Sequence, residues 1–296
     1  EELIINKYYK YKSLYRYFNN LLTKAKTKII IEVVYYNFEN LILNEVANNL
    51  NIPTIELQHG TMGRNHIAYN FSKKIKLNQL PRYMFLFSEY WKNNTQLPLL
   101  NDYIKITGFP YFENQLKIYN TKKKVKKQKQ ILFISQTTIG LELSKFATRV
   151  LDSIDSNEYQ ITYKFHPAEQ DNWEQRMPWL YKKSEFIRIA NNTTPLYQLF
   201  AESDILIGVY STAIYEGLGF NLDTYIVKLP GYEAVLPLIQ NKYVKIISHP
   251  DELITNLRNT EPNQVKKNIS FWKDNAKENI INEIFHILKG IDNSHQ

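Results

Sequence analysis

The chain contains no cysteine, so disulfide bonds and thiolate chemistry are excluded. It also contains no run of about 18 consecutive apolar residues, the length that a membrane-spanning helix needs. No apolar segment typical of a secretory signal opens the sequence. We therefore expect a protein of the cytoplasm, with peripheral contact with the inner face of the cytoplasmic membrane as a further expectation.

Several sequence motifs that are typical of particular enzyme classes are also absent. The sequence lacks the phosphate-binding motif Gly-x-x-x-x-Gly-Lys-Ser/Thr, the dinucleotide motif Gly-x-Gly-x-x-Gly and the nucleophile elbow Gly-x-Ser-x-Gly. Its His, Asp and Glu residues show no metal-ligand spacing. We therefore expect neither a bound metal nor a resident cofactor.

What the chain does have is positive charge, with a net charge of +8 over 296 residues. One interpretation is a lysine-rich composition without functional meaning. The other is attraction to an anion, such as a nucleotide phosphate, an anionic lipid surface or a nucleic acid. The length and the 44% of hydrophobic residues suit one large or two medium globular domains.

Strand-like and helix-like segments alternate along the chain, which favours parallel sheets with helical crossovers. β-branched and aromatic runs predict strands at residues 28–36, 53–58, 83–88, 103–107, 131–135, 160–165, 186–189, 204–209, 224–227 and 244–247. Apolar residues at helical spacing predict helices at residues 7–27, 40–50, 139–153, 194–202, 212–219 and 262–290. The fold class is therefore α/β.

A lysine-rich segment, residues 121–130, interrupts this alternation and is the best candidate for a domain boundary. It predicts an N-terminal Rossmann-like domain over 1–120 and a C-terminal one over 131–296, closed by the C-terminal helix. The first domain is short of strands for a complete domain. The lysines are expected to form a solvated linker, with docking to an anionic membrane as the alternative.

His166 ends a predicted strand and precedes Pro167, which cannot continue a hydrogen-bonded ladder. An imidazole at the edge of a sheet can donate a hydrogen bond to a phosphate oxygen and carry charge near neutral pH. Lys164 lies two residues earlier, on the same side of the strand, and would add positive charge. A histidine that merely caps a loop is the alternative interpretation.

Ser211 and Thr212 follow another apolar strand and precede a predicted helix. Hydroxyl groups and free N–H groups at the start of a helix bind anions, although Ser-Thr is also a common helix cap. Glu216, one helical turn further, could accept hydrogen bonds from ribose hydroxyls or be an ordinary solvated glutamate.

His59 follows the strand at 53–58 in the segment Gln-His-Gly-Thr-Met-Gly-Arg. The glycines permit a tight turn, and a histidine on such a turn could be the general base toward an acceptor hydroxyl. Arg64 and His66 are further candidates for contacts with the acceptor. A turn without chemistry is the alternative interpretation.

These residues resemble a known pattern. Residues 104–113, Ile-Lys-Ile-Thr-Gly-Phe-Pro-Tyr-Phe-Glu, resemble the inter-domain stretch of GT-B glycosyltransferases, and residues 203–219 resemble their donor-binding segment. Lys-x-His-Pro combined with Ser-Thr is similar to bacterial capsule enzymes, including polysialyltransferases and CDP-glycerol glycerophosphotransferases. The resemblance implies two Rossmann-like domains facing across a cleft. It also implies that His166, Ser211 and Thr212 hold the donor phosphate and that His59 is the base.

The function we expect is metal-independent transfer of a sugar from a nucleotide-activated donor, CMP-linked as one option, to a hydroxyl of a bacterial capsule or lipopolysaccharide. The first alternative is transfer of glycerol or ribitol phosphate from a CDP-activated donor on the same scaffold. The second is a non-catalytic protein that binds anions or nucleic acid through its charge. The expected partners are a nucleotide-sugar and a glycan or glycolipid, without nucleic acid.

Overall fold

The computed structural model describes residues 2–75, 77–119, 127–259 and 271–294. Its chain divides into two compact units. The first unit joins Glu1–Glu113 to Ile269–Gln296, and the second unit is Asn114–Asn268. Each unit is built around its own parallel sheet.

The first unit has a sheet of four parallel strands in the order β1-β2-β3-β4. The strands are β1 (Ile30–Glu32), β2 (Thr54–Leu57), β3 (Tyr83–Leu86) and β4 (Ile104–Ile106). The helical elements are α1 (Glu2–Lys24), α2 (Phe38–Asn49), η1 (Ile67–Tyr69), α3 (Glu89–Asn93), η2 (Asn101–Tyr103), α4 (Pro110–Tyr119), which extends into the second unit, and α12 (Ala276–Ser294). The strands expected here are confirmed, each shorter than predicted.

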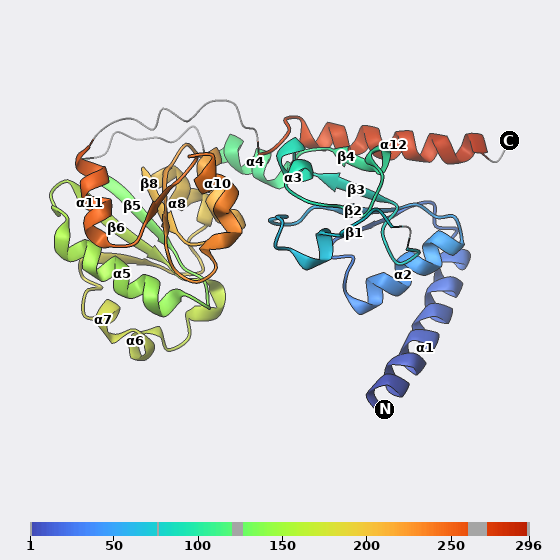
Figure 1. Cartoon of the computed structure of the whole chain (residues 1–296), viewed down its shortest axis with the longest axis horizontal. Helices are drawn as coiled ribbons and strands as arrows, with labels where there is room; N and C mark the ends of the chain where they lie inside the picture. Colours follow the sequence, from blue (N-terminus) through green and yellow to red (C-terminus); the bar gives the residue numbers. More distant parts are fainter. Residues whose placement is uncertain (1, 76, 120–126, 260–270, 295–296) are drawn as a thin grey trace. The chain divides into compact units, whose positions relative to one another are not determined.

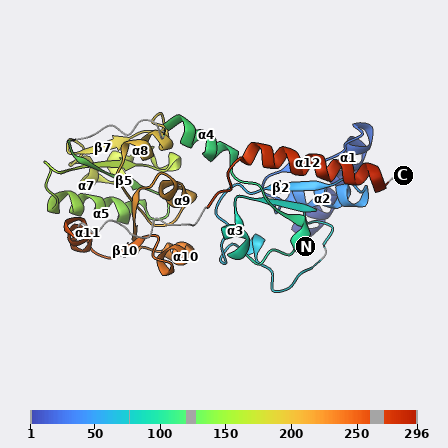
Figure 2. The ribbon, with the colours of Figure 1, turned by 90° about the horizontal axis from the view of Figure 1, so that it is seen from above.

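Helices cover both faces of this sheet, with α12 on one side and α1 and α2 on the other (Figures 1 and 2). Ile287 packs with Ile55 and Phe85, which point to the α12 face. Leu22 of α1 packs with Val46 of α2 on the opposite side. Because side chains alternate along a strand, Glu32 and Glu56 point to the α2 face and leave the α12 face apolar.

The C-terminal helix corrects the predicted domain boundaries, because α12 belongs to the first unit and does not close the second. Its apolar stripe is buried against the first sheet, and Asn279 Nδ2 donates to the Thr107 carbonyl over 3.0 Å. Gly108 is also close to this segment: a Cβ there would lie 2.2 Å from the Lys273 carbonyl. The predicted linker is displaced too, since Lys129 and Gln130 already belong to β5. Residues 120–126 and 260–270, with parts of the predicted linker and helix, lie outside the described residues.

The second unit contains a sheet of six parallel strands in the order β10-β9-β8-β5-β6-β7. The strands are β5 (Lys129–Ile134), β6 (Tyr159–Lys164), β7 (Ile187–Ala190), β8 (Ile205–Gly208), β9 (Asp223–Val227) and β10 (Lys245–Ile247). The helical elements are α5 (Gly140–Ser153), η4 (Pro167–Glu169), α6 (Trp173–Arg176), α7 (Pro178–Tyr181), α8 (Leu196–Glu202), α9 (Thr212–Gly219), η5 (Tyr232–Val235), α10 (Leu236–Gln240) and α11 (Pro250–Arg258). All six strands expected in this region are confirmed.

The central strands of the second unit are buried on both faces, which explains their continuous apolar sequences. Ile131 and Phe133 of β5, with Ile207 of β8, are fully buried in the core under α5 and α11. This core fixes the strands in place, and their carboxyl ends carry the polar residues singled out above.

Candidate functional site

The second sheet has a topological switch point between β5 and β8. From β5 the chain proceeds through β6 to β7 on one side, whereas β8, β9 and β10 lie on the other side. In open parallel sheets, ligands bind in the crevice that forms at the carboxyl ends of such a strand pair. Gln136 follows β5, and its Oε1 accepts a hydrogen bond from the Tyr210 backbone N–H after β8, 3.4 Å away. The two loops that frame the crevice are thus joined.

His166 lies beside this switch point, at the end of β6, with its side chain exposed. Its Nδ1 accepts a hydrogen bond from the Ala168 backbone N–H at 3.2 Å. A neutral imidazole that accepts through Nδ1 carries its proton on Nε2. The structure therefore orients His166 with Nε2 as a donor, the arrangement that a phosphate oxygen requires.

Glu169 fixes the backbone at His166, and no sequence prediction included it. Its buried carboxylate accepts from the His166 backbone N–H at 2.9 Å and from the Ser135 hydroxyl at 3.1 Å. Gly140 makes room for it, because a Cβ at this position would lie 1.7 Å from Glu169 Oε1. The His-x-x-Glu spacing of a capping box was the signal available in the sequence.

Ser211 and Thr212 stand on the other side of β5, at the start of α9. Ser211 is the N-cap of the helix, and its Oγ accepts from the Ala213 N–H at 3.0 Å. The hydroxyl hydrogen of Ser211 stays available to a ligand, because the cap uses only the oxygen. The first N–H groups of a helix have no intrahelical partner, so this end of α9 favours a negative group.

His166 follows β6, and the Ser211-Thr212 pair follows β8. These two strands lie on either side of β5 in the sheet. A parallel sheet spaces neighbouring strands by about 4.8 Å, so the two groups lie about 10 Å apart at the strand level. A pyrophosphate that accepts one hydrogen bond at each end spans a distance of this order.

Lys164 does not have the position expected for a phosphate ligand. Its side chain is buried, and its ammonium donates to the backbone carbonyls of Asn191 and of Thr194, the latter at 3.2 Å. Burial also lowers the pKa of Lys164. The side chain therefore fixes the loop that follows β7 and contributes little free charge to the crevice.

Glu216 is a buried residue of α9 rather than a solvated one, with 8% of its surface exposed. Burial raises the pKa of its carboxyl to about 7, opposed by a hydrogen bond from Tyr197. This carboxyl is therefore poised to change charge near neutral pH.

In the first unit, His59 lies at the carboxyl end of β2. Gln58 fixes its loop: Gln58 Oε1 accepts from the Phe87 N–H at 2.9 Å and Gln58 Nε2 donates to the Gly60 carbonyl at 2.8 Å. Desolvation, with a contribution from the charge of His66, lowers the pKa of His59. His59 is therefore neutral at physiological pH, as a general base must be.

An aromatic cluster surrounds His59 and contains His66, Tyr36 and Tyr69. The Tyr36 ring lies 6.5 Å from the His59 ring and 5.5 Å from the His66 ring, centroid to centroid. The rings of His66 and Tyr69 are 4.6 Å apart. His66 thus lies next to His59, whereas the other predicted acceptor-side residue, Arg64, is exposed on the same loop.

Two buried carboxyls lie beneath this cluster, in register on neighbouring strands. Glu56 accepts from the Tyr69 hydroxyl at 2.7 Å, and Glu32 accepts from Asn44 at 2.7 Å. Burial raises the pKa of each to about 7. No sequence signal singles these two residues out, because strand alternation places them in a run of apolar residues.

The backbone next to this cluster is strained at Val34, whose φ of 62° is uncommon for a β-branched residue. Side chains of Asn37 and Asn40 donate to the Val34 carbonyl, each at 3.1 Å, and stabilise the conformation. Such strain concentrates at functional sites.

Within the described part of the chain, no group of three or more His, Cys, Asp or Glu residues is placed to hold a metal ion. The expectation of metal-independent chemistry stays a prediction. Among these same residues, no helix combines the length and apolar character needed to cross a bilayer.

The fold is shared with solved enzyme structures. The putative UDP-N-acetylglucosamine 2-epimerase of Listeria monocytogenes superposes with a TM-score of 0.65 at 11% identity, covering 96% of this chain and 80% of that chain. The UDP-GlcNAc 2-epimerase of Neisseria meningitidis bound to UDP-GlcNAc gives 0.62 at 15% identity, with 93% and 81% covered. The wall teichoic acid polymerase TagF soaked with CDPG gives 0.57 at 15% identity, with 91% and 73% covered. At these identities the similarity shows the fold, two Rossmann-like domains of the GT-B type.

The protein thus has the GT-B fold, with a candidate anion site at the switch point of its second sheet. A family model described as CDP-Glycerol:Poly(glycerophosphate) glycerophosphotransferase matches residues 118–270, which is more than half of the chain. The chain belongs to this family, and it is a transferase that uses a nucleotide-activated donor in surface-polymer synthesis. The expectation of an enzyme is confirmed, and the second alternative, a non-catalytic binding protein, is wrong. No curated protein sequence matches the chain significantly.

Proposed function

We propose that the protein transfers glycerol phosphate, or a related polyol phosphate, from a CDP-activated donor to a hydroxyl group of a surface polymer. The observation that carries the proposal is the extent of the family match, which includes the whole second sheet, His166 and the start of α9. Sugar transfer, the function ranked first from the sequence, uses the same fold and a nucleotide-activated donor as well, but the description of the matched family names glycerophosphate transfer. A CMP-linked sugar donor and a capsule or lipopolysaccharide acceptor are therefore the less favoured proposals.

The donor site is the switch point of the second sheet. His166 Nε2 donates to one phosphate of the donor, and the Ser211 hydroxyl with the start of α9 binds the other. Glu216 is buried, with 8% of its surface exposed, so we assign it a structural role under the site rather than a contact with the ribose.

The base is His59. It accepts the proton of the acceptor hydroxyl as that oxygen attacks the phosphorus atom bonded to the polyol. A new P–O bond forms to the acceptor, the P–O bond to the CMP phosphate breaks, and CMP leaves with the bonding electron pair. His166 and the start of α9 stabilise the negative charge that develops on the leaving phosphate.

The test is to incubate the purified protein with CDP-glycerol, CDP-ribitol, a CMP-sugar or a UDP-sugar, together with a hydroxyl-bearing acceptor. Mass spectrometry of the product separates polyol-phosphate transfer from glycosyl transfer. His249 provides a matched control, because it also precedes a proline at the carboxyl edge of the same sheet, after β10. We expect CMP release with CDP-glycerol to be lost in His166→Ala and kept in His249→Ala. Glycosylated product, or full activity of His166→Ala, would overturn the proposal.

A further inference from the structure

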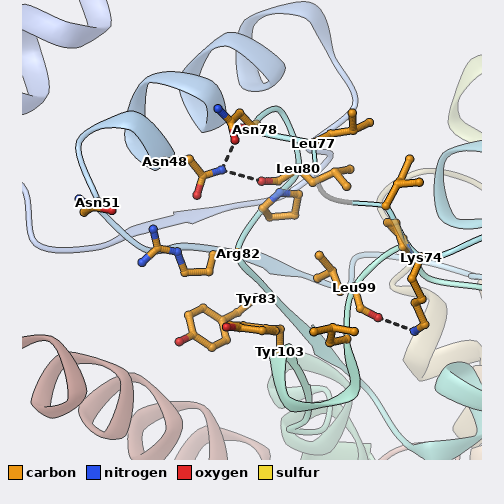
Figure 3. A pocket seen from close by; sticks show the side chains of 14 residues that line it. Asn48, Asn51, Lys74, Leu77, Asn78, Leu80, Arg82, Tyr83, Leu99 and Tyr103 are labelled. Atoms are coloured by element: carbon orange, nitrogen blue, oxygen red, sulfur yellow. Dashed lines mark hydrogen bonds between the residues drawn. The ribbon is translucent and has the colours of Figure 1, made fainter. Parts of the chain in front are cut away.

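A pocket opens at the amino edge of the first sheet, opposite the edge that carries His59 (Figure 3). Its volume is about 660 Å³, enough for a small part of a polymeric ligand. Part of its lining comes from the starts of three strands: Asn51 lies shortly before β2, Tyr83 begins β3 and Tyr103 precedes β4. The pocket therefore belongs to a different place in the fold from the proposed base.

The wall of this pocket is fixed by hydrogen bonds. Asn48 Nδ2 of α2 donates to the carbonyls of Asn78 at 2.8 Å and Leu80 at 3.0 Å, as Figure 3 shows. The Arg82 backbone N–H donates to the Thr54 hydroxyl at 2.9 Å. The hollow is thus held open without a ligand.

The lining carries two cations, Lys74 and Arg82, and contains no carboxylate. Lys74 donates to the Leu99 carbonyl, which anchors its ammonium at the rim. Within the described residues, the guanidinium of Arg82 makes neither a hydrogen bond nor an ion pair. The guanidinium of Arg82 lies close enough to Tyr83 to act on its ionisation. Burial raises the pKa of Tyr83, and the positive charge of Arg82 opposes this increase. A free guanidinium in a preformed hollow is suited to a phosphate group, which it binds through two parallel hydrogen bonds.

The other groups of the pocket suit a polyol. The rings of Tyr83 and Tyr103 lie 5.4 Å apart and present hydroxyl groups next to apolar ring faces. A neighbouring pocket of about 580 Å³ shares Lys74 and adds Lys73 and Lys92, with Glu89 as its carboxylate. Positive charge therefore continues from one hollow to the next.

Building on the proposed function, we propose that this pocket binds a phosphodiester of the acceptor polymer at a distance from the growing end. The reacting hydroxyl belongs at the opposite, carboxyl edge of the sheet, beside His59. An acceptor that extends along the first unit can occupy both edges, so a long acceptor gains a contact that a single polyol phosphate lacks.

The experiment is equilibrium binding of a fluorescently labelled glycerol phosphate oligomer to the protein without donor, followed by kinetics with the oligomer and with single glycerol phosphate as acceptors. The variants are Arg82→Gln and Arg82→Lys. Arg16→Gln is the matched control, since it removes the same charge from an exposed position on α1 of the same unit. Thermal unfolding checks that every variant is folded.

We expect Arg82→Gln to weaken oligomer binding about tenfold, corresponding to 1.4 kcal/mol, and to raise KM for the oligomer alone. Arg82→Lys should retain part of the binding, and Arg16→Gln all of it. Unchanged oligomer binding in a folded Arg82→Gln protein would overturn the inference, as would an equal loss for long and single acceptors. Oligomer binding is measured without donor, so it does not depend on the transfer reaction. If the protein binds the oligomer through Arg82 but does not use CDP-glycerol, the proposed function is refuted and the pocket assignment stands.

Discussion

The backbone N–H of His166 donates to one oxygen of Glu169 at 2.9 Å, while the other oxygen accepts from the Ser135 hydroxyl at 3.1 Å. A single buried carboxylate therefore ties the end of β6 to the end of β5. The hydrogen bond from the His166 N–H to Glu169 closes the turn at residues 166–169. This turn also places the Ala168 N–H where it donates to His166 Nδ1, so the link orients the histidine ring.

Replacing Glu169 with alanine should reduce both activity and stability. The substitution leaves the His166 N–H and the Ser135 hydroxyl without their acceptor, which costs about 1–3 kcal/mol of unfolding free energy. We expect kcat to fall about tenfold or more as the imidazole loses its orientation, with partial rescue in Glu169→Gln, which keeps an acceptor oxygen. Steady-state kinetics and denaturant unfolding measure the two effects. Glu174→Gln, on the exposed side of α6, is the control, and wild-type kcat in Glu169→Ala would refute the positioning role.

His59 predicts an acid limb in the pH profile. Because its pKa lies below the ordinary value of 6.5, the base form predominates by neutral pH. The value of kcat/KM should therefore rise from acidic pH, with a midpoint below 6.5, and level off near pH 7. His59→Ala should lower kcat by roughly 10²–10⁴-fold and remove this limb. His286→Ala, at an exposed position of α12, should retain it. A profile unchanged in His59→Ala would exclude the residue as the base.

Glu216 predicts a loss of stability between acidic and neutral pH. Its folded pKa of about 7 exceeds the ordinary value of 4.5, so the native state binds more protons than the unfolded state in this window. Stability therefore falls as pH rises from 4.5 through 7. Glu216→Gln should be as stable as the wild type at the acidic end and roughly 1–3 kcal/mol more stable at pH 8. Denaturant unfolding at both pH values tests this.

The exposed Glu185→Gln variant is the control for that series and should follow the wild type at each pH. Glu32 and Glu56 titrate in the same window, so Glu216→Gln should flatten the pH dependence without abolishing it. A Glu216→Gln protein whose stability keeps the full wild-type pH dependence would contradict the assignment.

The position of α12 predicts which unit loses stability when the helix is weakened. Ile287 is 5% exposed and packs against Ile55 and Phe85. Ile287→Ala should therefore destabilise the first unit by about 2–4 kcal/mol. Hydrogen exchange should accelerate in β2 and β3 and stay unchanged in β5 and β8.

Ile281→Ala removes the same atoms from the outer side of α12, where the residue is 40% exposed, and should have little effect. Faster exchange confined to the second sheet would instead support the boundary that the sequence analysis predicted.

Much of the fold was predictable from local patterns. Runs such as Ile205–Gly208 are short, apolar and rich in isoleucine, which favours buried strands in any arrangement. The same patterns placed His59, His166 and Ser211 at strand ends, because each follows an apolar run directly. Local periodicity reports that an element is buried, but it does not report which element buries it.

Because local periodicity does not identify the packing partner, the predictions for the C-terminal helix and for Lys164 were wrong. The apolar stripe of α12 predicted a buried helix, yet only the packing of Ile287 on Ile55 assigned it to the first unit. Lys164 alternates correctly with His166, but the loop after β7 captures its ammonium, a contact between residues 27 positions apart. Glu169 was not singled out in the sequence, because its contact with Ser135, for which Gly140 makes room, joins residues 34 positions apart.

The sequence by itself determined the alternation of strands and helices and the polar groups that follow the strands, because both depend on neighbouring residues. Only the tertiary structure decided the order β10-β9-β8-β5-β6-β7, and with it that His166 and Ser211 flank one strand. The tertiary structure also decided which charged side chains pair with other groups of the protein, as Lys164 does with two backbone carbonyls. Strand order and side-chain pairing arise from contacts between distant residues, and no local periodicity encodes them.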